Sequence, residues 1–413
     1  MNFPSDFRPV VTALTDTDLY KFTMQQVMLH HNPSAVGVTE FFCRNTPLFP
    51  LAELEAEVNQ QLDWLCTLQF TDEELDFLAM RPYFKADYIE FLRLFKFQRK
   101  FITVFTKGDR LCIRAEGPLV HITGFEIHVL TIVNELYFRR SDQKQARVCG
   151  EQRLAEKIAS LRTFAAGVCM APWYSPEAKD FEFFDFGTRR RYSRDWHAHV
   201  VKTLAEQVPQ YFKGTSNVYL AMRYNLVPMG TMAHEHLQKH QGLGGQLRHA
   251  QKAALEEWAQ EYRGDLGIAL TDVINMDSFL RDFDRYFAAL FDGMRHDSGD
   301  AFIWGEKAVQ HYKKLRIEPR TKRLVFSNGL DFETSFALYA EFASRIQTGF
   351  GIGTWLSNDV GLVPLNIVMK LLEVNCQPVA KISDDPGKTI CKDKVFLRYL
   401  CQVNAIAASW LDA

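Results

Sequence analysis

The densest group of reactive side chains lies in the sequence Arg295-His296-Asp297-Ser298-Gly299-Asp300, directly after an apolar segment. Carboxylates at the end of a strand can accept the hydroxyls of a sugar or hold Mg²⁺, and a guanidinium can neutralise a phosphate. A solvated loop with an internal Arg–Asp pair is the alternative. Because packing alone hardly explains this density of charge, the sequence predicts a functional site around Arg295 and Asp297.

Small and hydroxyl-bearing residues follow several other apolar segments. The glycines of Gly349-Phe350-Gly351-Ile352-Gly353-Thr354 allow the backbone to approach a phosphate closely, and Thr354 adds a hydroxyl. Gly214-Thr215-Ser216 and Gly230-Thr231 repeat this chemistry at two further positions. A turn at a barrel corner is the alternative for any one of them. Together they are typical of strand ends that bind phosphate in a barrel.

A third candidate is Phe186-Gly187-Thr188-Arg189-Arg190-Arg191, which joins an aromatic ring to three successive cations. An aromatic face beside a guanidinium suits a flat anionic ring such as an aromatic carboxylate. The basic residues could equally form the exposed start of a helix. This stretch is therefore a candidate binding site for a ring, with Arg189 as one candidate cation.

Histidines cluster around position 234, in Met232-Ala233-His234-Glu235-His236. The H-E-x-x-H zinc motif is absent, and an i, i+2 spacing points two side chains of a helix apart. His240 lies four residues after His236, so a surface metal pair stays possible. Gly230-Thr231 just upstream makes His234 a candidate nucleophile, with a structural histidine as the alternative.

Near the C-terminus, Pro386-Gly387-Lys388-Thr389 resembles the end of a P-loop. A P-loop requires a glycine five residues before Gly387, but Ile382 occupies that position, which argues against a Walker site. Lys388 and the amides of the turn could still hold a phosphate. A solvated turn is the alternative.

The elements that must position these residues follow two patterns. Up to residue 140, helical stretches (16–30, 51–70 and 73–93) mix with strand-like segments (36–43, 101–106 and 110–115), which predicts an α+β domain. Residues 143–164 are predicted to be helical. Seven short apolar segments then alternate with helical stretches, as in a (β/α) barrel: 182–186, 210–213, 226–229, 267–270, 291–294, 323–326 and 346–350.

We therefore predict an α/β fold, an irregular (β/α) barrel over residues 141–369 with an N-terminal α+β domain over 1–140. Residues 370–413, expected to form a strand, a turn and a closing helix, complete the N-terminal domain and could pack back on it. The polar residues should gather at the carboxyl ends of the barrel strands.

Composition limits the classes of function. Across 413 residues, 48 Lys and Arg balance 50 Asp and Glu, so no overall positive field attracts nucleic acid or an anionic membrane. The first residues show no basic region followed by an apolar stretch, and no run of about 18 apolar residues is evident, so we expect neither secretion nor a membrane span. The eight dispersed cysteines, without zinc spacing, predict free, mostly buried thiols in the cytoplasm.

These motifs, in this order, resemble bacterial nicotinate phosphoribosyltransferases along nearly the whole chain. Two further landmarks are Thr15-Asp16-Thr17-Asp18-Leu19-Tyr20-Lys21-Phe22-Thr23-Met24 and Asn217 after Ser216. The resemblance implies that nicotinate, phosphoribosyl pyrophosphate (PRPP) and ATP become nicotinate mononucleotide, pyrophosphate, ADP and phosphate, with Mg²⁺, as an entry step to NAD. It also implies a homodimer with shared active sites.

The resemblance carries roles to particular residues. His234 would be phosphorylated by ATP, with Asp272 as the partner of its ring. Arg295 and Asp297 would hold PRPP. The other residues assigned to substrate by the resemblance are Gly353 and Thr354 at the 5′-phosphate, Tyr20 and Phe186 around the pyridine ring, Arg189 and Ser216 at its carboxylate, and Thr215, Lys388 and Arg44.

Tyr20 and Arg44 would come from the partner subunit. Asn328 departs from the Asp that many bacterial members carry, and we leave it out of the predicted site. The sequence does not name the ligands of Mg²⁺.

Two alternatives stay open. A nicotinamide phosphoribosyltransferase would perform the same chemistry on the amide, and position 216 should distinguish it, because amide-using relatives carry Asp there. A phosphohistidine-bearing sensor of PRPP or NAD precursors would not turn substrate over. Retention of Arg295, Asp297 and the Gly353-Thr354 loop argues against a sensor.

Overall fold

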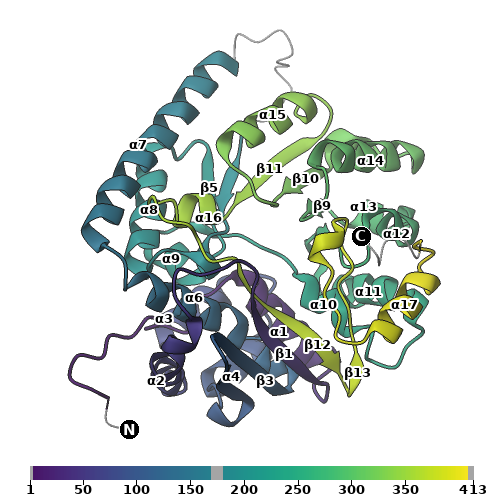
Figure 1. The fold of residues 1–413 in the computed structure, drawn as a ribbon. Helices are drawn as coiled ribbons and strands as arrows, with labels where there is room; N and C mark the ends of the chain where they lie inside the picture. The colour runs from purple at the N-terminus through teal and green to yellow at the C-terminus, as the bar shows by residue number, and fades with distance from the viewer. Residues whose placement is uncertain (1–2, 169–179, 408–413) are drawn as a thin grey trace.

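A computed structural model describes residues 3–168 and 180–407 and contains two β-sheets. Figure 1 shows the N-terminal sheet and its helices below the strands and helices of the second sheet, with the C-terminal strands returning to the first. This arrangement agrees with the predicted fold class, and the division at residues 140 and 369 stays a prediction. Cys169 and residues 408–413 lie outside the described residues.

The first sheet is antiparallel and completed from the far end of the chain. Its order is β13 (Gln377–Pro378), β12 (Ile367–Val374), β1 (Val36–Cys43), β3 (Arg110–Pro118) and β2 (Ile102–Lys107). Phe41 of β1 lies opposite Met369 of β12, and Thr39 lies opposite Ala115 of β3. The predicted completion of the N-terminal domain by the C-terminal segment is thus confirmed.

The N-terminal helices are shorter than predicted. The first begins at Leu19 rather than Asp16, because Asp18 is extended and its carboxylate binds elsewhere. The helix predicted over 73–93 is broken around Pro82, since proline disfavours a helical conformation of the residue before it. The α-helices of this part are α1 (Leu19–His31), α2 (Glu55–Leu65), α3 (Asp72–Ala79), α4 (Ala86–Leu94), α5 (Leu119–Ile122) and α6 (Phe125–Phe138).

The second sheet contains all seven predicted strands, each shifted by at most two residues, and curls into a half-barrel. Every neighbouring pair is parallel. Its order is β6 (Val227–Pro228), β5 (Phe212–Thr215), β4 (Phe183–Asp185), β11 (Gln347–Ile352), β10 (Arg323–Phe326), β9 (Gly293–His296) and β8 (Ile268–Leu270).

The half-barrel is open between β6 and β8, since no strand pairing among the described residues joins them. The hydroxyl of Thr231, just after β6, donates to the carbonyl of Ile268, at 2.7 Å. The two edges of the sheet are therefore connected by a side-chain hydrogen bond instead of backbone hydrogen bonds between strands. The remaining described strand is β7 (Arg263–Leu266).

Helices cover this sheet. The longest, α7 (Gln143–Val168), matches the helix predicted from residue 143. The others are α8 (Arg194–Gln207), α9 (Val218–Arg223), α10 (His234–Lys239), α11 (Ala250–Tyr262), α12 (Met276–Asp282), α13 (Arg285–Leu290), α14 (Ala301–Lys314), α15 (Phe332–Phe342) and α16 (Thr354–Ser357).

The closing helix differs from the expectation that it packs on the N-terminal domain. Helix α17 (Lys394–Val403) contacts the 3₁₀ turn Leu247–His249 of the barrel part, and it buries Leu400 and Cys401. Arg281 also donates to the carbonyl of Asn404, at 2.7 Å. The strands β12 and β13 return to the first sheet, and the apolar residues of β12 continue the sheet's buried face.

Aromatic residues fill much of the core. The Phe350 ring lies between those of Phe181 and Phe326, with centroid separations of 5.0 and 5.7 Å. By composition, the stretch 119–138 could span a membrane, but 83% of its most apolar window is buried inside the protein. It therefore serves as core. The seven described cysteines are free, and most are half-buried instead of buried as predicted.

Candidate active site

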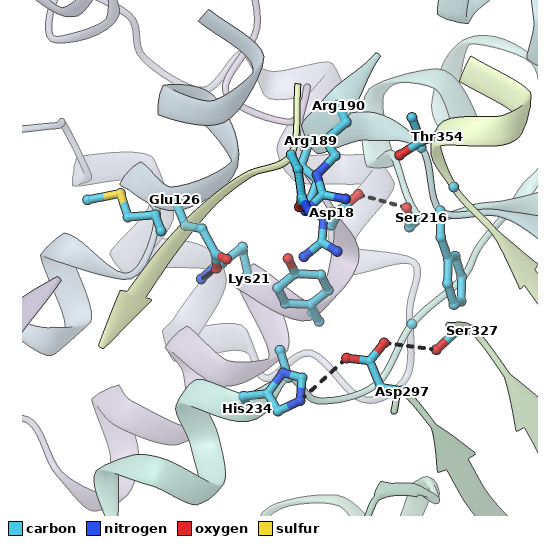
Figure 2. Close-up of a pocket in the computed structure, with 18 of the residues that line it drawn as sticks. Asp18, Lys21, Glu126, Arg189, Arg190, Ser216, His234, Asp297, Ser327 and Thr354 are labelled. Carbon is cyan, nitrogen blue, oxygen red and sulfur yellow. Dashed lines mark hydrogen bonds and ion pairs between the residues drawn. The ribbon is translucent and has the colours of Figure 1, made fainter. Parts of the chain in front are cut away.

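A cavity of about 570 Å³ opens where the N-terminal helices meet the carboxyl ends of the half-barrel strands. Figure 2 shows side chains from both parts pointing into it. The predicted site residues that line it are Tyr20, Phe186, Arg189, Ser216, His234, Arg295, Asp297, Gly353 and Thr354. One chain thus brings most of the predicted site together.

The segment before α1 is bound to the barrel by buried polar contacts. Both oxygens of Asp16 accept hydrogen bonds from Arg191, at 2.6 and 2.8 Å, and both side chains are almost completely buried. Burial raises the pKa of Asp16, but the charge of Arg191 outweighs it and lowers the pKa to about 2. The amide of Leu19 donates to the carbonyl of Ser216, at 2.8 Å. These contacts place Tyr20 in the cavity.

The structure places Tyr20 beside the other site residues of its own chain, because Tyr20 and Asp297 line one cavity. A contribution of Tyr20 to the site of a partner subunit stays a prediction. Arg44 follows β1, and its amide donates to the carbonyl of Asn366, a residue of the cavity wall. Burial and the nearby charge of Arg189 lower the pKa of Arg44. The short, buried connection between residues 16–19 and the barrel accounts for the position of Tyr20.

At one end of the cavity, the imidazole of His234 is held by two carboxylates. Its Nε2 lies 2.9 Å from Oδ1 of Asp272 and 3.4 Å from Oδ2 of Asp297. The other oxygen of Asp272 accepts a hydrogen bond from Ser298, at 2.6 Å, and pairs with Nζ of Lys381, at 2.8 Å. Asp272 does not line the cavity, so its role is to fix the ring.

The contacts of His234 determine which nitrogen is free. Burial, reinforced by the charge of Lys381 and opposed by Asp272, lowers the pKa of His234 to about 4, so the ring is neutral at pH 7. With Nε2 donating to Asp272, the lone pair lies on Nδ1. No hydrogen bond among the described residues uses Nδ1, and His234 lines the cavity. The imidazole is thus arranged as a nucleophile.

Two guanidinium groups of the cavity lack partners. None of the hydrogen bonds or ion pairs found in the described part of the chain involves the guanidinium of Arg189, which is half-buried at the end of the cavity opposite His234, although Asp18 and Tyr20 lie nearby. Nε of Arg295, beside Asp297, is buried without a hydrogen-bond partner. Because an anion would supply the missing acceptors, this arrangement favours binding of an anion.

The hydroxyl of Ser216 donates a hydrogen bond within the protein. It donates to Oδ1 of Asp18, at 2.7 Å, and both side chains are buried (Figure 2). Burial raises the pKa of Asp18. The predicted donation from Ser216 to a nicotinate carboxylate would require this hydroxyl to leave Asp18, and that role stays a prediction. Asp18 was not predicted as the partner of Ser216.

Family models match two parts of the chain: the nicotinate phosphoribosyltransferase family over residues 181–407, and its N-terminal domain over residues 15–134. The chain belongs to this family. A nicotinate phosphoribosyltransferase of Herminiimonas arsenicoxydans is 58% identical over 395 residues, covering 96% of this chain and 98% of the relative.

A second relative, the nicotinate phosphoribosyltransferase of Chromobacterium violaceum, is 55% identical, with 97% of this chain and 98% of the relative covered. Among solved structures, the nicotinate phosphoribosyltransferase of Vibrio cholerae has a TM-score of 0.90 at 33% identity, covering 98% of this chain and 96% of the other. The match therefore extends over both sheets.

In this member of the nicotinate phosphoribosyltransferase family, one glycine of the Gly349–Thr354 stretch is required for packing inside the protein. A Cβ on Gly351 would lie 2.3 Å from the ring of Phe186. This glycine makes room for the ring against β11, whereas Gly353 and Thr354 line the cavity. The prediction of close phosphate approach thus applies to the end of the stretch.

Besides Arg44, two predicted substrate-binding residues are not part of the cavity lining. Thr215 is fully buried, and its hydroxyl donates to Oδ2 of Asp185, at 2.5 Å, so it supports the strand end instead of facing a ligand. Nζ of Lys388 donates to Oδ1 of Asn328, at 2.8 Å. Asn328 therefore contributes to the position of Lys388, although it was left out of the predicted site.

The second histidine cluster is buried, in contrast to the surface pair considered from sequence. His236, His240 and Glu257 bring potential ligand atoms together. However, the ammonium group of Lys239 binds the same oxygen of Glu257 that faces His240. A cation is thus already present at the carboxylate, and the cluster is an internal ion pair network between α10 and α11.

Charged residues that sequence analysis missed line the inner wall of the cavity. Nζ of Lys21 lies 2.6 Å from Glu126 and 2.8 Å from Glu235 (Figure 2). Lys370 of β12 also faces this wall, and burial lowers its pKa to about 8. Lys21 lies in the family's N-terminal motif, which could have indicated it, but Lys370 and Lys381 stand in no recognised pattern.

Proposed function

We propose that this chain catalyses the transfer of a phosphoribosyl group from PRPP to the ring nitrogen of nicotinate, the entry step of NAD synthesis. One observation carries the proposal: a single cavity holds Asp297, Arg295 and a free imidazole nitrogen of His234 at one end, and Arg189 beside Tyr20 at the other. Family membership supports the same reaction.

The proposed reaction forms a bond between the pyridine nitrogen and C1 of the ribose as the bond from C1 to pyrophosphate breaks. Positive charge develops on the sugar, and Asp297 is placed to stabilise it. Arg295, which lines the cavity, is a candidate for the phosphates, and Gly353 with Thr354 for the 5′-phosphate. Lys388 lies outside the cavity lining but within electrostatic range of Asp297, and it is a second candidate for the phosphates. Tyr20 and Phe186 supply aromatic faces for the ring.

We further propose that ATP transfers its γ-phosphoryl group to Nδ1 of His234. The Nδ1 lone pair attacks phosphorus, the bond to ADP breaks, and Asp272 accepts the hydrogen bond from Nε2 that stabilises the product. The free Nδ1 and the depressed pKa of His234 support this step. ATP assists only if the phosphorylated enzyme binds the substrates differently from the free enzyme.

The acidic residues offer no preformed Mg²⁺ site. Among the described residues, the one ligand-type cluster at the cavity is His234, Asp272 and Asp297, and Asp272 is already bound to Lys381 and Ser298. Mg²⁺ also prefers an all-oxygen shell with several waters. We therefore propose that Mg²⁺ enters on the phosphates of PRPP and ATP.

Nicotinate is the proposed substrate in preference to nicotinamide because the guanidinium of Arg189 makes no hydrogen bond or ion pair with the described residues. A guanidinium forms strong, charge-assisted hydrogen bonds with a carboxylate but gains less from a neutral amide. A homodimer in the cytoplasm remains our prediction for the setting, but each chain holds a whole cavity of its own.

The test is to incubate purified protein with PRPP, Mg²⁺ and either nicotinate or nicotinamide, with and without ATP, and to identify products by mass. We expect nicotinate mononucleotide and pyrophosphate, formed faster with ATP. Preferential formation of nicotinamide mononucleotide would support the amide-using alternative. Histidine labelling by ATP without any mononucleotide would support the sensor.

A further inference from the structure

Lys381 lies behind the reactive histidine, outside the cavity wall. It is 4% exposed, and its Nζ lies 2.8 Å from Oδ2 of Asp272, whose other oxygen binds His234. We propose that Lys381 is a positioning residue that compensates the charge of Asp272, so that this carboxylate orients the imidazole of His234 without drawing a proton onto it. The inference rests on the proposed function of His234 as the nucleophile.

The backbone holds Lys381 firmly in place. The segment around it docks beside the end of β8, where the amide of Ile382 donates to the carbonyl of Val273, at 2.8 Å. Lys381 itself forms two backbone hydrogen bonds with Ile390, at 2.9 and 3.1 Å. The ammonium group is thus delivered by a C-terminal segment that crosses from the first sheet to the barrel.

The electrostatic reasoning starts from the carboxylate. A buried carboxylate within hydrogen-bond distance of an imidazole stabilises the protonated ring and raises its pKa. A protonated His234 would have no lone pair to attack ATP. With Lys381 on the opposite oxygen, the net charge of the Asp272–Lys381 pair is close to zero. Asp272 can then accept the Nε2–H hydrogen bond and fix the tautomer while the ring stays neutral.

Other charged groups around His234 do not replace Lys381. Asp297 also faces the ring, at 3.4 Å, and favours protonation, which makes the compensating charge more important. Glu235 on the same helix is bound by Lys21 and Thr123. The remaining charged groups near His234, Asp272 and Asp297 include Arg295 at the end of β9 and Lys388 near the C-terminus.

The test compares Lys381→Met, which removes the charge, with Lys381→Arg, which keeps it. Lys307→Met is a matched control, because Lys307 forms an exposed ion pair with Asp277 and does not line the cavity. The pKa of His234 is measured by NMR of ring-labelled histidine, with His234→Gln to assign the signal. ATP-dependent labelling of the protein is measured from pH 5 to pH 8.

We expect Lys381→Met to raise the pKa of His234 by about one to three units, the usual effect of an uncompensated neighbouring charge. Labelling at pH 6 should then fall relative to pH 8, by about twofold for a two-unit shift and about tenfold for a three-unit shift, whereas the wild type, Lys381→Arg and Lys307→Met change little. The shift should disappear in the Asp272→Asn background, because Lys381 acts through Asp272. The double variant also leaves no unpaired buried charge, so it should fold if Lys381→Met alone does not.

An unchanged pKa in Lys381→Met, or a shift that persists in the Asp272→Asn background, would overturn the inference. A uniform loss of labelling at every pH, with no shift, would assign Lys381 a merely structural role. If the wild type is never labelled by ATP, the proposed nucleophile is wrong. The NMR titration would still decide whether Lys381 controls the charge of His234.

Discussion

The two ends of the cavity differ in how completely the protein satisfies its own charges. At the histidine end, His234, Asp272, Lys381 and Ser298 are linked by contacts of 2.6 to 2.9 Å before any ligand is present. At the arginine end, Arg189 has no such contact in the described part of the chain. The side chains of the first end are already held in place by one another, whereas the second end offers a free guanidinium to an anion.

This difference teaches that burial alone does not identify a ligand site. A saturated network keeps its geometry without substrate and spends no reorganisation energy during the reaction. A half-buried cation without a partner, such as Arg189, instead forms its strongest hydrogen bonds when an anion binds. Variants at the two ends should therefore fail in different assays.

The largest effect is expected for His234→Ala. It should abolish ATP-dependent labelling, because no other imidazole lines the cavity among the described residues. Its thermal unfolding temperature should change little, since the ring packs against polar groups instead of core. Phosphate release under acid from the labelled protein measures the first quantity, and calorimetry the second. Undiminished acid-labile phosphate would exclude His234.

Next in size is the effect of Arg189→Met on nicotinate. We expect kcat/KM to fall by about a hundredfold to a thousandfold, because a charge-assisted contact in a buried site is lost. Use of nicotinamide should fall less. Arg190→Met is the matched control, since that guanidinium already binds Ile367 and Asn366. An equal loss of kcat/KM for nicotinate in Arg189→Met and Arg190→Met would mean that Arg189 does not select the carboxylate.

Substitutions at Ser216 should separate charge from hydrogen bonding. Because its hydroxyl is used by Asp18, Ser216→Ala should lower kcat/KM for nicotinate by less than about tenfold. Ser216→Asp should lower it more steeply, since a second carboxylate beside Asp18 repels nicotinate. Steady-state kinetics on both pyridines measures the two effects. A large loss in the alanine variant would restore the direct role first expected for Ser216.

A small effect of pH is expected on labelling of the wild type. The pKa of His234 is lowered to about 4, so the ring stays neutral and reactive from pH 8 down to about pH 5, and protonation reduces the rate below that. Initial labelling rates across this range provide the measurement. An acid limb near pH 6.5 would show that the ring is not protected from protonation.

No recovery at all is expected when Tyr20→Ala and Asp297→Ala proteins are mixed. Each cavity draws both residues from one chain, so a mixed dimer would contain two damaged sites. Nicotinate mononucleotide formation after proven subunit exchange is the measurement. Restored activity would show that Tyr20 crosses to the partner subunit after all.

The sequence could predict the residues that follow each strand, but not the contacts made between distant segments of the chain. The strands and their polar ends follow from local patterns, so Arg295, Asp297, His234 and Arg189 were placed correctly in one cavity. Lys381 could not be predicted, because it meets Asp272 across 109 positions of the chain only after the C-terminal segment has docked. The packing of α17 depended on the same tertiary step.

The partner of Ser216 was missed for a related reason. Asp18 stands in a recognisable motif, but its contact with Ser216 arises only when the segment before α1 binds the half-barrel. Which chain supplies Tyr20 to a given site also stays a prediction, because a motif names a residue and does not specify the chain it comes from. Contacts between distant segments are fixed by the assembled fold.

The most direct test of the division between the two ends crosses His234→Ala and Arg189→Met in a pair of assays on the same preparations. One assay measures phosphoenzyme formed from ATP alone, and the other measures the preference for nicotinate over nicotinamide with PRPP. We predict that Arg189→Met keeps the phosphoenzyme and loses the preference, whereas His234→Ala loses the phosphoenzyme and keeps the preference in its residual activity. Loss of both properties in both variants would contradict the account.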